Sequence, residues 1–436
     1  MDRRTFLRVA AAGAALPVLA SCGAARSGVI RFEGWDYEAQ LVQQNVDLFT
    51  SRNPGVEVDY TPITSAQFIR KLTAEFLGGA GPDVLYMYDD SLAGSVEAEY
   101  LRPLDDIPGV AEVYDAIYPT NAAAMVYGGK RYGLPYYTDM QALVYNEAIL
   151  EKAGISAPPR TLDELEHQAL RIKDAGILPF PIGLPAQLAD TAALWTWAMV
   201  YANGQDLFDE RLAPVMSAPG SATVGVFEWL TRVTRQSAVL DPACVQTLPI
   251  PMDNAVMAGQ YAFVFAPRYA LRSYNDPAKS TVAGAIRLAP VPSLDGTTEG
   301  TVSSTRMYCL GRDSTRSPEV SDGAVRLLHH FGGLDANGVP ATARFWFLER
   351  GLGFPFPQLA QDPEVLATLE TFADPAMYSR LAETARARTV TAAPWYAEFE
   401  TALQRTTQQV IIGATGPAEA AAGLDAETRL LAERYA

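Results

Sequence analysis

An aromatic residue directly precedes an acidic one in Trp35-Asp36 and in Tyr88-Asp89-Asp90, two candidate ligand contacts in the first hundred residues. An aromatic ring can stack on a flat apolar face, and a carboxylate can accept hydrogen bonds from two neighbouring donors. These residue types favour non-covalent recognition of a small ligand. The sequence contains no HExxH, CxxC, GxSxG or phosphate-binding Gly-rich motif. A secreted glycosidase or lyase, which needs only two suitably spaced carboxylates, remains the enzymatic alternative.

The elements that would position these residues alternate between strands and helices. Apolar runs predict strands near 29–32, 56–60 and 82–87, and periodic apolar residues predict helices at 37–52 and 65–77. This alternation is typical of an open, mostly parallel sheet, in which ligands bind beyond the carboxyl ends of the strands. We therefore expect both aromatic–acidic pairs to lie at a ligand-binding edge.

The rest of the chain continues with mixed strands and helices and ends in a helical third. Thr161 and Glu164 have the spacing of a capping box that opens a helix, and further strands are predicted near 141–145, 281–288 and 307–310. The last third is predicted to be helical over 318–331, 363–372 and 396–412.

Length and charge narrow the class of protein. A chain of 436 residues is long enough for two domains or lobes, and its net charge of −16 disfavours binding to nucleic acid or to anionic lipid. Cys244 and Cys309 could form one disulfide, although we expect buried free thiols. The residue types offer no clustered Cys and His ligands for a metal, and we predict no metal and no cofactor.

The first residues predict export. A basic start, Arg3-Arg4, is followed by an apolar run to Ala20 that is too short to span a bilayer. Leu19-Ala20-Ser21-Cys22 resembles a lipobox, which implies a signal peptide over 1–21, a lipid on Cys22 and a tether over 22–28. The lipid would be the only membrane attachment. The paired arginines also resemble a twin-arginine signal, so the export route stays open.

Several short segments in a fixed order resemble the extracellular solute-binding proteins of sugar importers, which are relatives of maltose-binding protein. The segments that carry this resemblance are 29–36, Asn53-Pro54-Gly55-Val56, Gly81-Pro82-Asp83-Val84, 128–135, Leu143-Val144-Tyr145-Asn146, 152–155, 158–165, Tyr201-Ala202-Asn203-Gly204 and Gly413-Ala414-Thr415.

The resemblance implies an α/β fold of the type II periplasmic-binding-protein class, a clamshell of two lobes, each a mixed sheet flanked by helices. Lobe one would hold 29–138 and 307–355, lobe two would hold 142–303 and 360–436, and hinges would lie near 139–141, 304–306 and 356–359. It further implies a monomer that takes up a carbohydrate, performs no catalysis and delivers the ligand to the permease of an ATP-binding-cassette (ABC) importer.

The resemblance also suggests where the ligand contacts lie. At the positions where relatives usually have a glycine, a proline and a tryptophan, this chain has Ala266-Pro267-Arg268 followed by Tyr269, and a second Gly-rich position reads Ser303-Ser304-Thr305-Arg306. The predicted ligand-binding residues are Trp35, Asp36, Asp89, Asp90, Asp139, Trp195, Trp197, Arg268, Tyr269, Ser303, Ser304, Arg306 and Trp395.

The chemical class of the ligand stays open at this point. Arg268 and Arg306 would suit an anionic ligand such as a glycerophosphodiester or a sugar acid. The acidic chain and its aromatic residues would suit a polyamine. A neutral sugar or oligosaccharide fits the resemblance best.

Overall fold

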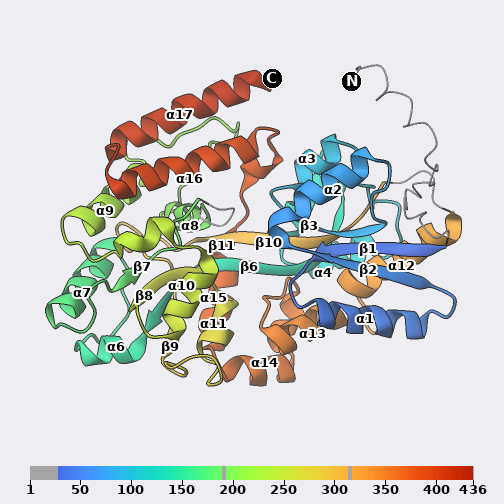
Figure 1. Cartoon of the computed structure of the whole chain (residues 1–436), viewed down its shortest axis with the longest axis horizontal. Helices are drawn as coiled ribbons and strands as arrows, with labels where there is room; N and C mark the ends of the chain where they lie inside the picture. Colours follow the sequence, from blue (N-terminus) through green and yellow to red (C-terminus); the bar gives the residue numbers. More distant parts are fainter. Residues whose placement is uncertain (1–27, 189–192, 313–316, 436) are drawn as a thin grey trace, which may run out of the picture.

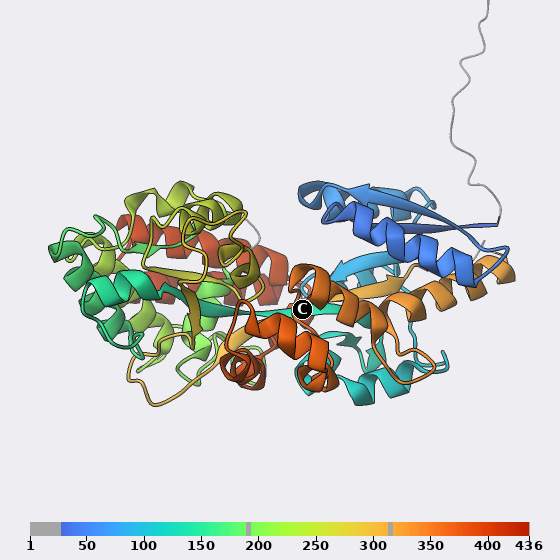
Figure 2. The same ribbon diagram turned by 90° about the horizontal axis from the view of Figure 1, so that it is seen from below.

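The computed structural model describes residues 28–188, 193–312 and 317–435. The predicted signal peptide and Cys22 lie outside the described residues. Two α/β lobes lie next to each other, with long strands running from one to the other (Figure 1). The same division is visible at right angles to this view, where the teal strand β6 passes between the lobes (Figure 2).

The first lobe begins with the alternation that the apolar pattern predicts. In α1, Leu41, Val42, Val46 and Phe49 form the buried stripe, and the helix ends where Asn53 and the left-handed Gly55 (φ 88°) turn the chain. The elements of this lobe are β1 (Val29–Trp35), α1 (Ala39–Arg52), β2 (Glu57–Ile63), the 3₁₀ helix η1 (Ser65–Gln67), α2 (Phe68–Leu77), β3 (Val84–Tyr88), α3 (Leu92–Glu97), α4 (Val110–Ala116), α5 (Pro119–Ala124), β4 (Val126–Tyr127) and β5 (Lys130–Arg131).

The second lobe follows the long strand β6 (Gly133–Asn146). The predicted capping box is confirmed, because the Thr161 hydroxyl accepts from the Glu164 amide at 3.0 Å at the start of α7. The elements are α6 (Glu147–Lys152), α7 (Leu162–Asp174), β7 (Ile182–Gly183), α8 (Leu194–Tyr201), α9 (Ala222–Arg235), η2 (Pro242–Gln246), α10 (Pro249–Met257), β8 (Phe263–Pro267), α11 (Ala270–Tyr274) and β9 (Ile286–Ala289). The predicted strand at 281–288 is shorter than expected, because Gly284 (φ 83°) forms a turn before β9.

The last part of the chain is mostly helical, as predicted. After β10 (Thr301–Leu310) the chain returns to the first lobe and then crosses to the second. The elements are α12 (Pro318–Gly332), α13 (Ala341–Arg350), η3 (Pro357–Gln361), α14 (Pro363–Glu370), α15 (Pro375–Thr384), β11 (Ala385–Arg386), η4 (Thr389–Ala392), α16 (Tyr396–Ile412) and α17 (Pro417–Arg434).

One path of paired strands runs through both lobes in the order β2-β1-β3-β10-β6-β8-β7. In the first lobe β1 is parallel to β2 and β3, whereas β10 is antiparallel to both β3 and β6. The second half of β6 pairs with β8 and β9 instead. Because β6 and β10 extend past the first lobe, they connect its strands to those of the second lobe.

Two clusters of buried apolar side chains form the cores. The first is centred on β1, β3 and α12, and the second on α8, α9 and α16. Side chains of α10, α11 and β9 belong to the first cluster although these elements lie in the predicted second lobe. The two clusters therefore do not follow the predicted lobe limits, which stay a prediction. Cys244 and Cys309 are buried free thiols, as expected. Among the helices of the described ranges, none is long and apolar enough to cross a bilayer.

Candidate functional site

The strands that join the lobes bring several predicted site residues together. In β10, Arg306 lies opposite Tyr88 of β3 on one side and Tyr137 of β6 on the other. Two residues earlier, Ser304 lies opposite Asp139. The register between β10 and β6 shifts at Arg306, and such an irregularity redirects side chains away from the regular ladder.

Asp89 is the centre of a buried charge cluster directly after β3. Its Oδ2 accepts from the Thr305 amide at 3.0 Å, and its Oδ1 lies 2.9 Å from Nη1 of Arg306. A second arginine, Arg388, approaches the same Oδ1 to 3.4 Å and Oδ2 of Asp90 to 3.4 Å. Burial lowers the pKa of Arg306, but Asp89 and its other neighbours outweigh that effect and raise it above the usual value, so the guanidinium stays charged.

Trp35, Tyr88 and Arg306 form a layered contact at the end of the parallel strands. The rings of Trp35 and Tyr88 stack with centroids 4.6 Å apart and planes inclined by 16°. The guanidinium carbon of Arg306 lies 4.7 Å from the centre of the same Tyr88 ring. Trp35 is itself 5% exposed and touches Phe68 and Tyr86 edge-on, so it belongs to the core as much as to a surface.

Asp139 connects β6 to the start of α11 through its two carboxylate oxygens. Oδ1 accepts from the Met140 amide at 2.7 Å and Oδ2 accepts from the Tyr269 amide at 2.9 Å. Burial raises its pKa to about 6, although Arg268 and these amides act in the opposite direction. The carboxylate therefore already has partners in the protein.

Arg268 is buried rather than open to a ligand. Its Nε lies 3.7 Å from Oδ1 of Asp139, and its Nη1 donates to the carbonyl of Tyr378 at 2.6 Å. Only 1% of its surface is exposed. Arg268 and Arg306 were both predicted ligand contacts, and in the structure each of them pairs with a carboxylate.

Three tyrosines with partly accessible surfaces lie at this place, where Tyr137 is opposite Arg306 and the Tyr269 amide donates to Asp139. They are Tyr37 after β1, Tyr137 in β6 and Tyr269 before α11. Burial raises the pKa of Tyr269 well above its usual value, and Tyr137, Asp253, Asp139 and Tyr37 act in the same direction, so these groups are near neighbours. Tyr37 is 36% exposed.

The remaining predicted residues lie elsewhere or inside the cores. The Nε1 of Trp195 donates to the Pro185 carbonyl, and Trp197 and Trp395 pack in the second cluster. Ser303 is buried with its hydroxyl 3.3 Å from that of Thr138. Asp36 is exposed, and its Oδ1 accepts from the Ser65 amide at 3.3 Å.

Sequence reasoning missed Arg388, Tyr37 and Tyr137. Tyr37 directly follows the predicted Trp35-Asp36 pair, and Tyr137 lies two residues before Asp139, so proximity could have found both. Arg388 lies 299 positions after its partner Asp89 in the sequence. Only the folded chain brings those two together.

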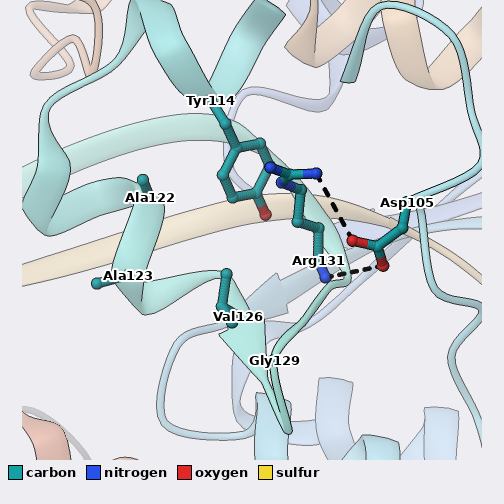
Figure 3. Close-up of a pocket in the computed structure, with 7 residues that line it drawn as sticks. All are labelled: Asp105, Tyr114, Ala122, Ala123, Val126, Gly129 and Arg131. Carbon is teal, nitrogen blue, oxygen red and sulfur yellow. Dashed lines mark hydrogen bonds and ion pairs between the residues drawn. The ribbon is translucent and has the colours of Figure 1, made fainter. Parts of the chain in front are cut away.

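A separate pocket lies in the first lobe (Figure 3). It has a volume of about 520 Å³, and its lining residues are Asp105, Tyr114, Ala122, Ala123, Val126, Gly129 and Arg131. Its one cation and one carboxylate pair with each other, since Nη1 of Arg131 lies 3.6 Å from Oδ1 of Asp105. None of the predicted ligand-binding residues lines it. In the ranges that the structure covers, no group of three His, Cys, Asp or Glu residues could hold a metal ion.

Comparison with known proteins finds one family and many similar folds. A family model described as bacterial extracellular solute-binding protein matches residues 35–310. A Brucella abortus protein described as a binding protein is 28% identical over 211 residues, 48% of this chain and 51% of that protein. A maltotriose-binding protein of Pyrococcus abyssi is 26% identical over 192 residues, 44% of this chain and 39% of that protein. The chain thus spans about half the length, or less, of these curated relatives.

Solved structures cover nearly the whole chain. Maltose-bound MalE3 of T. maritima superposes with a TM-score of 0.78 at 20% identity, over 92% of this chain and 99% of that chain. This likeness establishes the fold. The predicted two-lobed α/β architecture is confirmed.

Proposed function

Because the chain belongs to the family of bacterial extracellular solute-binding proteins, we propose that it is the substrate-binding protein of an ABC importer and that its substrate is a carbohydrate. It would capture the sugar between the lobes and deliver it to the permease. The observation that carries this proposal is the group of partly accessible tyrosines, Tyr37, Tyr137 and Tyr269, near the strands that cross between the lobes. A relative that is named a maltotriose-binding protein and a maltose-bound structure of the same fold support the ligand class.

The side chains that suit a sugar are those with accessible surface near this crossing. Tyrosine rings offer stacking faces for the C–H patches of a sugar and hydroxyls for its rim. Asp90 and Ser304 add partly exposed acceptors. We propose Tyr37, Tyr137 and Tyr269 as ligand contacts together with Asp90 and Ser304.

A neutral sugar is favoured over an anionic one because each of the three arginines described above already pairs with a carboxylate. Arg268 faces Asp139, while Arg306 and Arg388 share Asp89, and Arg388 also faces Asp90 and Glu400. An anionic ligand would have to displace a carboxylate from a buried pair, which leaves that carboxylate uncompensated. The neutral ligand needs no such exchange.

The export signal completes the proposal. Family members are extracellular, and we propose that this chain is held at the outer face of the membrane by a lipid on Cys22, in monomeric form. A single acyl anchor binds membranes only weakly, whereas the two chains of a diacylglyceryl group hold firmly. Metabolic labelling with a fatty acid would test this, because the full chain should incorporate label and Cys22→Ser should not.

Thermal unfolding with a ligand panel tests the function. The full chain carrying Cys22→Ser would be heated with neutral mono- and oligosaccharides, glycerophosphodiesters, sugar acids and polyamines. A ligand that binds only the folded state stabilises it by about 2.7 kcal/mol at one hundred times its dissociation constant. A shift with neutral sugars supports the proposal, and a shift confined to anions or polyamines contradicts the ligand class.

Two further measurements test the site and the absence of turnover. Tyr269→Ala should weaken sugar binding, whereas Tyr435→Ala, which alters an exposed tyrosine near the C-terminus, should not. Chromatography of the sugar after prolonged incubation should recover it unchanged. Release of shorter saccharides would support the glycosidase alternative instead.

A further inference from the structure

One arginine that the family resemblance did not suggest connects the two lobes. Arg388 directly precedes η4, whose Val390 packs in the second core cluster, and only 1% of its side chain is exposed. Its Nη2 lies 3.4 Å from Oδ1 of Asp89 and 3.4 Å from Oδ2 of Asp90, both at the end of β3 in the first lobe. One side of this guanidinium therefore contacts the first lobe.

The other end of the same guanidinium contacts α16 in the second lobe. Nη1 lies 3.2 Å from Oε1 of Glu400 and donates to the hydroxyl of Tyr396. That hydroxyl donates in turn to Glu400 at 2.9 Å. Both partners belong to α16, where Tyr396 is part of the second core cluster.

This double contact depends on the shape of an arginine. The guanidinium is a rigid planar fork with five donors, so it can hold separate acceptors on opposite sides, which the point charge of a lysine cannot do. Burial lowers the pKa of Arg388, but Tyr396, Asp89, Glu400 and Asp90 outweigh it and raise the pKa well above its usual value. Removing either set of acceptors would leave a buried charge partly uncompensated, which is costly.

We propose that Arg388 is a positioning residue that holds Asp90, a proposed ligand contact, beside Asp89 and couples the position of both to the second lobe. A rotation of one lobe against the other would have to break one of its two sets of contacts. The ligand part of this inference rests on the proposed function, whereas the coupling between the lobes does not.

The distance between the lobes is the direct readout. In the full chain carrying Cys22→Ser, cysteine would replace the exposed residues Leu77 of α2 and Leu430 of α17. Labels attached to these two cysteines would report the distance between the lobes. We expect R388Q to shift or broaden the distance distribution without ligand, and E400Q to do so to a smaller extent. R388K, which keeps the charge but not the fork, should resemble R388Q in distance while staying folded.

The matched control is R405Q on the same helix. Arg405 is exposed and pairs with Glu427 of α17 at 2.7 Å, within the second lobe, so its loss removes an equal charge without touching the first lobe. It should leave the distance unchanged. If R388Q does not fold, R388K and E400Q decide the question, and unchanged distances in both would overturn the coupling.

Affinity for maltotriose tests the positioning. We expect R388Q and R388K to bind it at least tenfold more weakly than the parent, with R405Q unchanged. An unchanged affinity in a variant with altered distance would overturn the positioning role. If the parent does not bind maltotriose, the proposed ligand class is in question, and the distance measurements alone still confirm or refute the coupling.

Discussion

The guanidinium carbon of Arg268 lies 3.6 Å from the centre of the Tyr378 ring, and the same side chain faces Asp139. Replacing Arg268 with glutamine would leave the buried Asp139 carboxylate uncompensated. We expect Arg268→Gln to destabilise the fold by about 3–5 kcal/mol, the usual cost of breaking a buried ion pair. Urea unfolding followed by fluorescence measures it. The control is Arg287→Gln, which breaks an exposed pair with Glu147 and should cost less than about 1 kcal/mol. Equal losses in the two variants would contradict the prediction.

Stability should depend on pH through Glu33 in β1. Burial, together with the carboxyl group of Glu75, raises the pKa of Glu33 from 4.5 to about 7, despite Lys71 and Arg31 nearby. The folded state then binds the proton more tightly than the unfolded state between these pH values. Protonated Glu33 therefore contributes its full stabilisation below pH 4.5, and this contribution is lost as the pH rises to about 7.

A substitution isolates this effect. The pKa difference corresponds to about 3 kcal/mol, so the free energy of unfolding of Glu33→Gln should fall less steeply than that of the parent between pH 4.5 and 7.5. Chemical denaturation at several pH values gives both curves. Glu57→Gln, at an exposed position of the neighbouring strand β2, should run parallel to the parent. Parallel curves for Glu33→Gln as well would show that Glu33 does not titrate in this range.

Gly353 lies against the crossing strand β6, where its carbonyl accepts from the Thr138 amide at 2.9 Å. A Cβ atom at this position would lie 2.1 Å from the carbonyl oxygen of Thr138 and 2.8 Å from Nη2 of Arg268. We expect Gly353→Ala to destabilise the protein by about 1–3 kcal/mol, because the backbone must move to make room. Gly423→Ala, in a helix with open space around it, should be neutral or stabilise by up to about 1 kcal/mol. A thermal melt of the two variants compares them directly, and a neutral Gly353→Ala would argue against this close approach.

The two buried cysteines should be unreactive in the native protein. Burial raises the pKa of the Cys244 thiol to about 12 and that of Cys309 above its usual value, so neither forms much thiolate at neutral pH. In the full chain carrying Cys22→Ser, mass spectrometry should detect no alkylation before unfolding and two alkylated thiols after it. A mass two units lower with no alkylation in the unfolded, unreduced chain would reveal a disulfide instead.

The sequence pattern predicted local elements well where one segment decides them. The apolar stripe of α1 and the capping box at Thr161 depend on residues a few positions apart, and both are present in the structure. The fold class followed from a series of short motifs in a fixed order. The position of Gly284, by contrast, shortened β9 through a turn that apolar content alone does not reveal.

The candidate site was harder to predict because its chemistry depends on distant pairings. The family resemblance placed Arg268 where relatives usually have a tryptophan and so suggested ligand contact, yet its carboxylate partner lies 129 positions earlier and Tyr378 lies 110 positions later. Trp195 and Trp197 were also named as candidate contacts, with one of the two expected in the core, but every residue of their helix is buried. Whether an arginine is free or neutralised is a tertiary property, and no local pattern records it.

The place of β10 between β3 and β6 also sets when the first lobe can form. Asp89 and Arg306 are separated by 217 positions, so β3 has no neighbour on that side until the chain has been made past residue 310. At about 5–20 residues per second, this interval lasts roughly 10 to 45 seconds. During that time the growing chain exposes an unpaired sheet edge and an incomplete core. Such a chain keeps a strand edge unpaired for longer than one built from consecutive hairpins, so shielding of β3 from other chains is a requirement of its biogenesis.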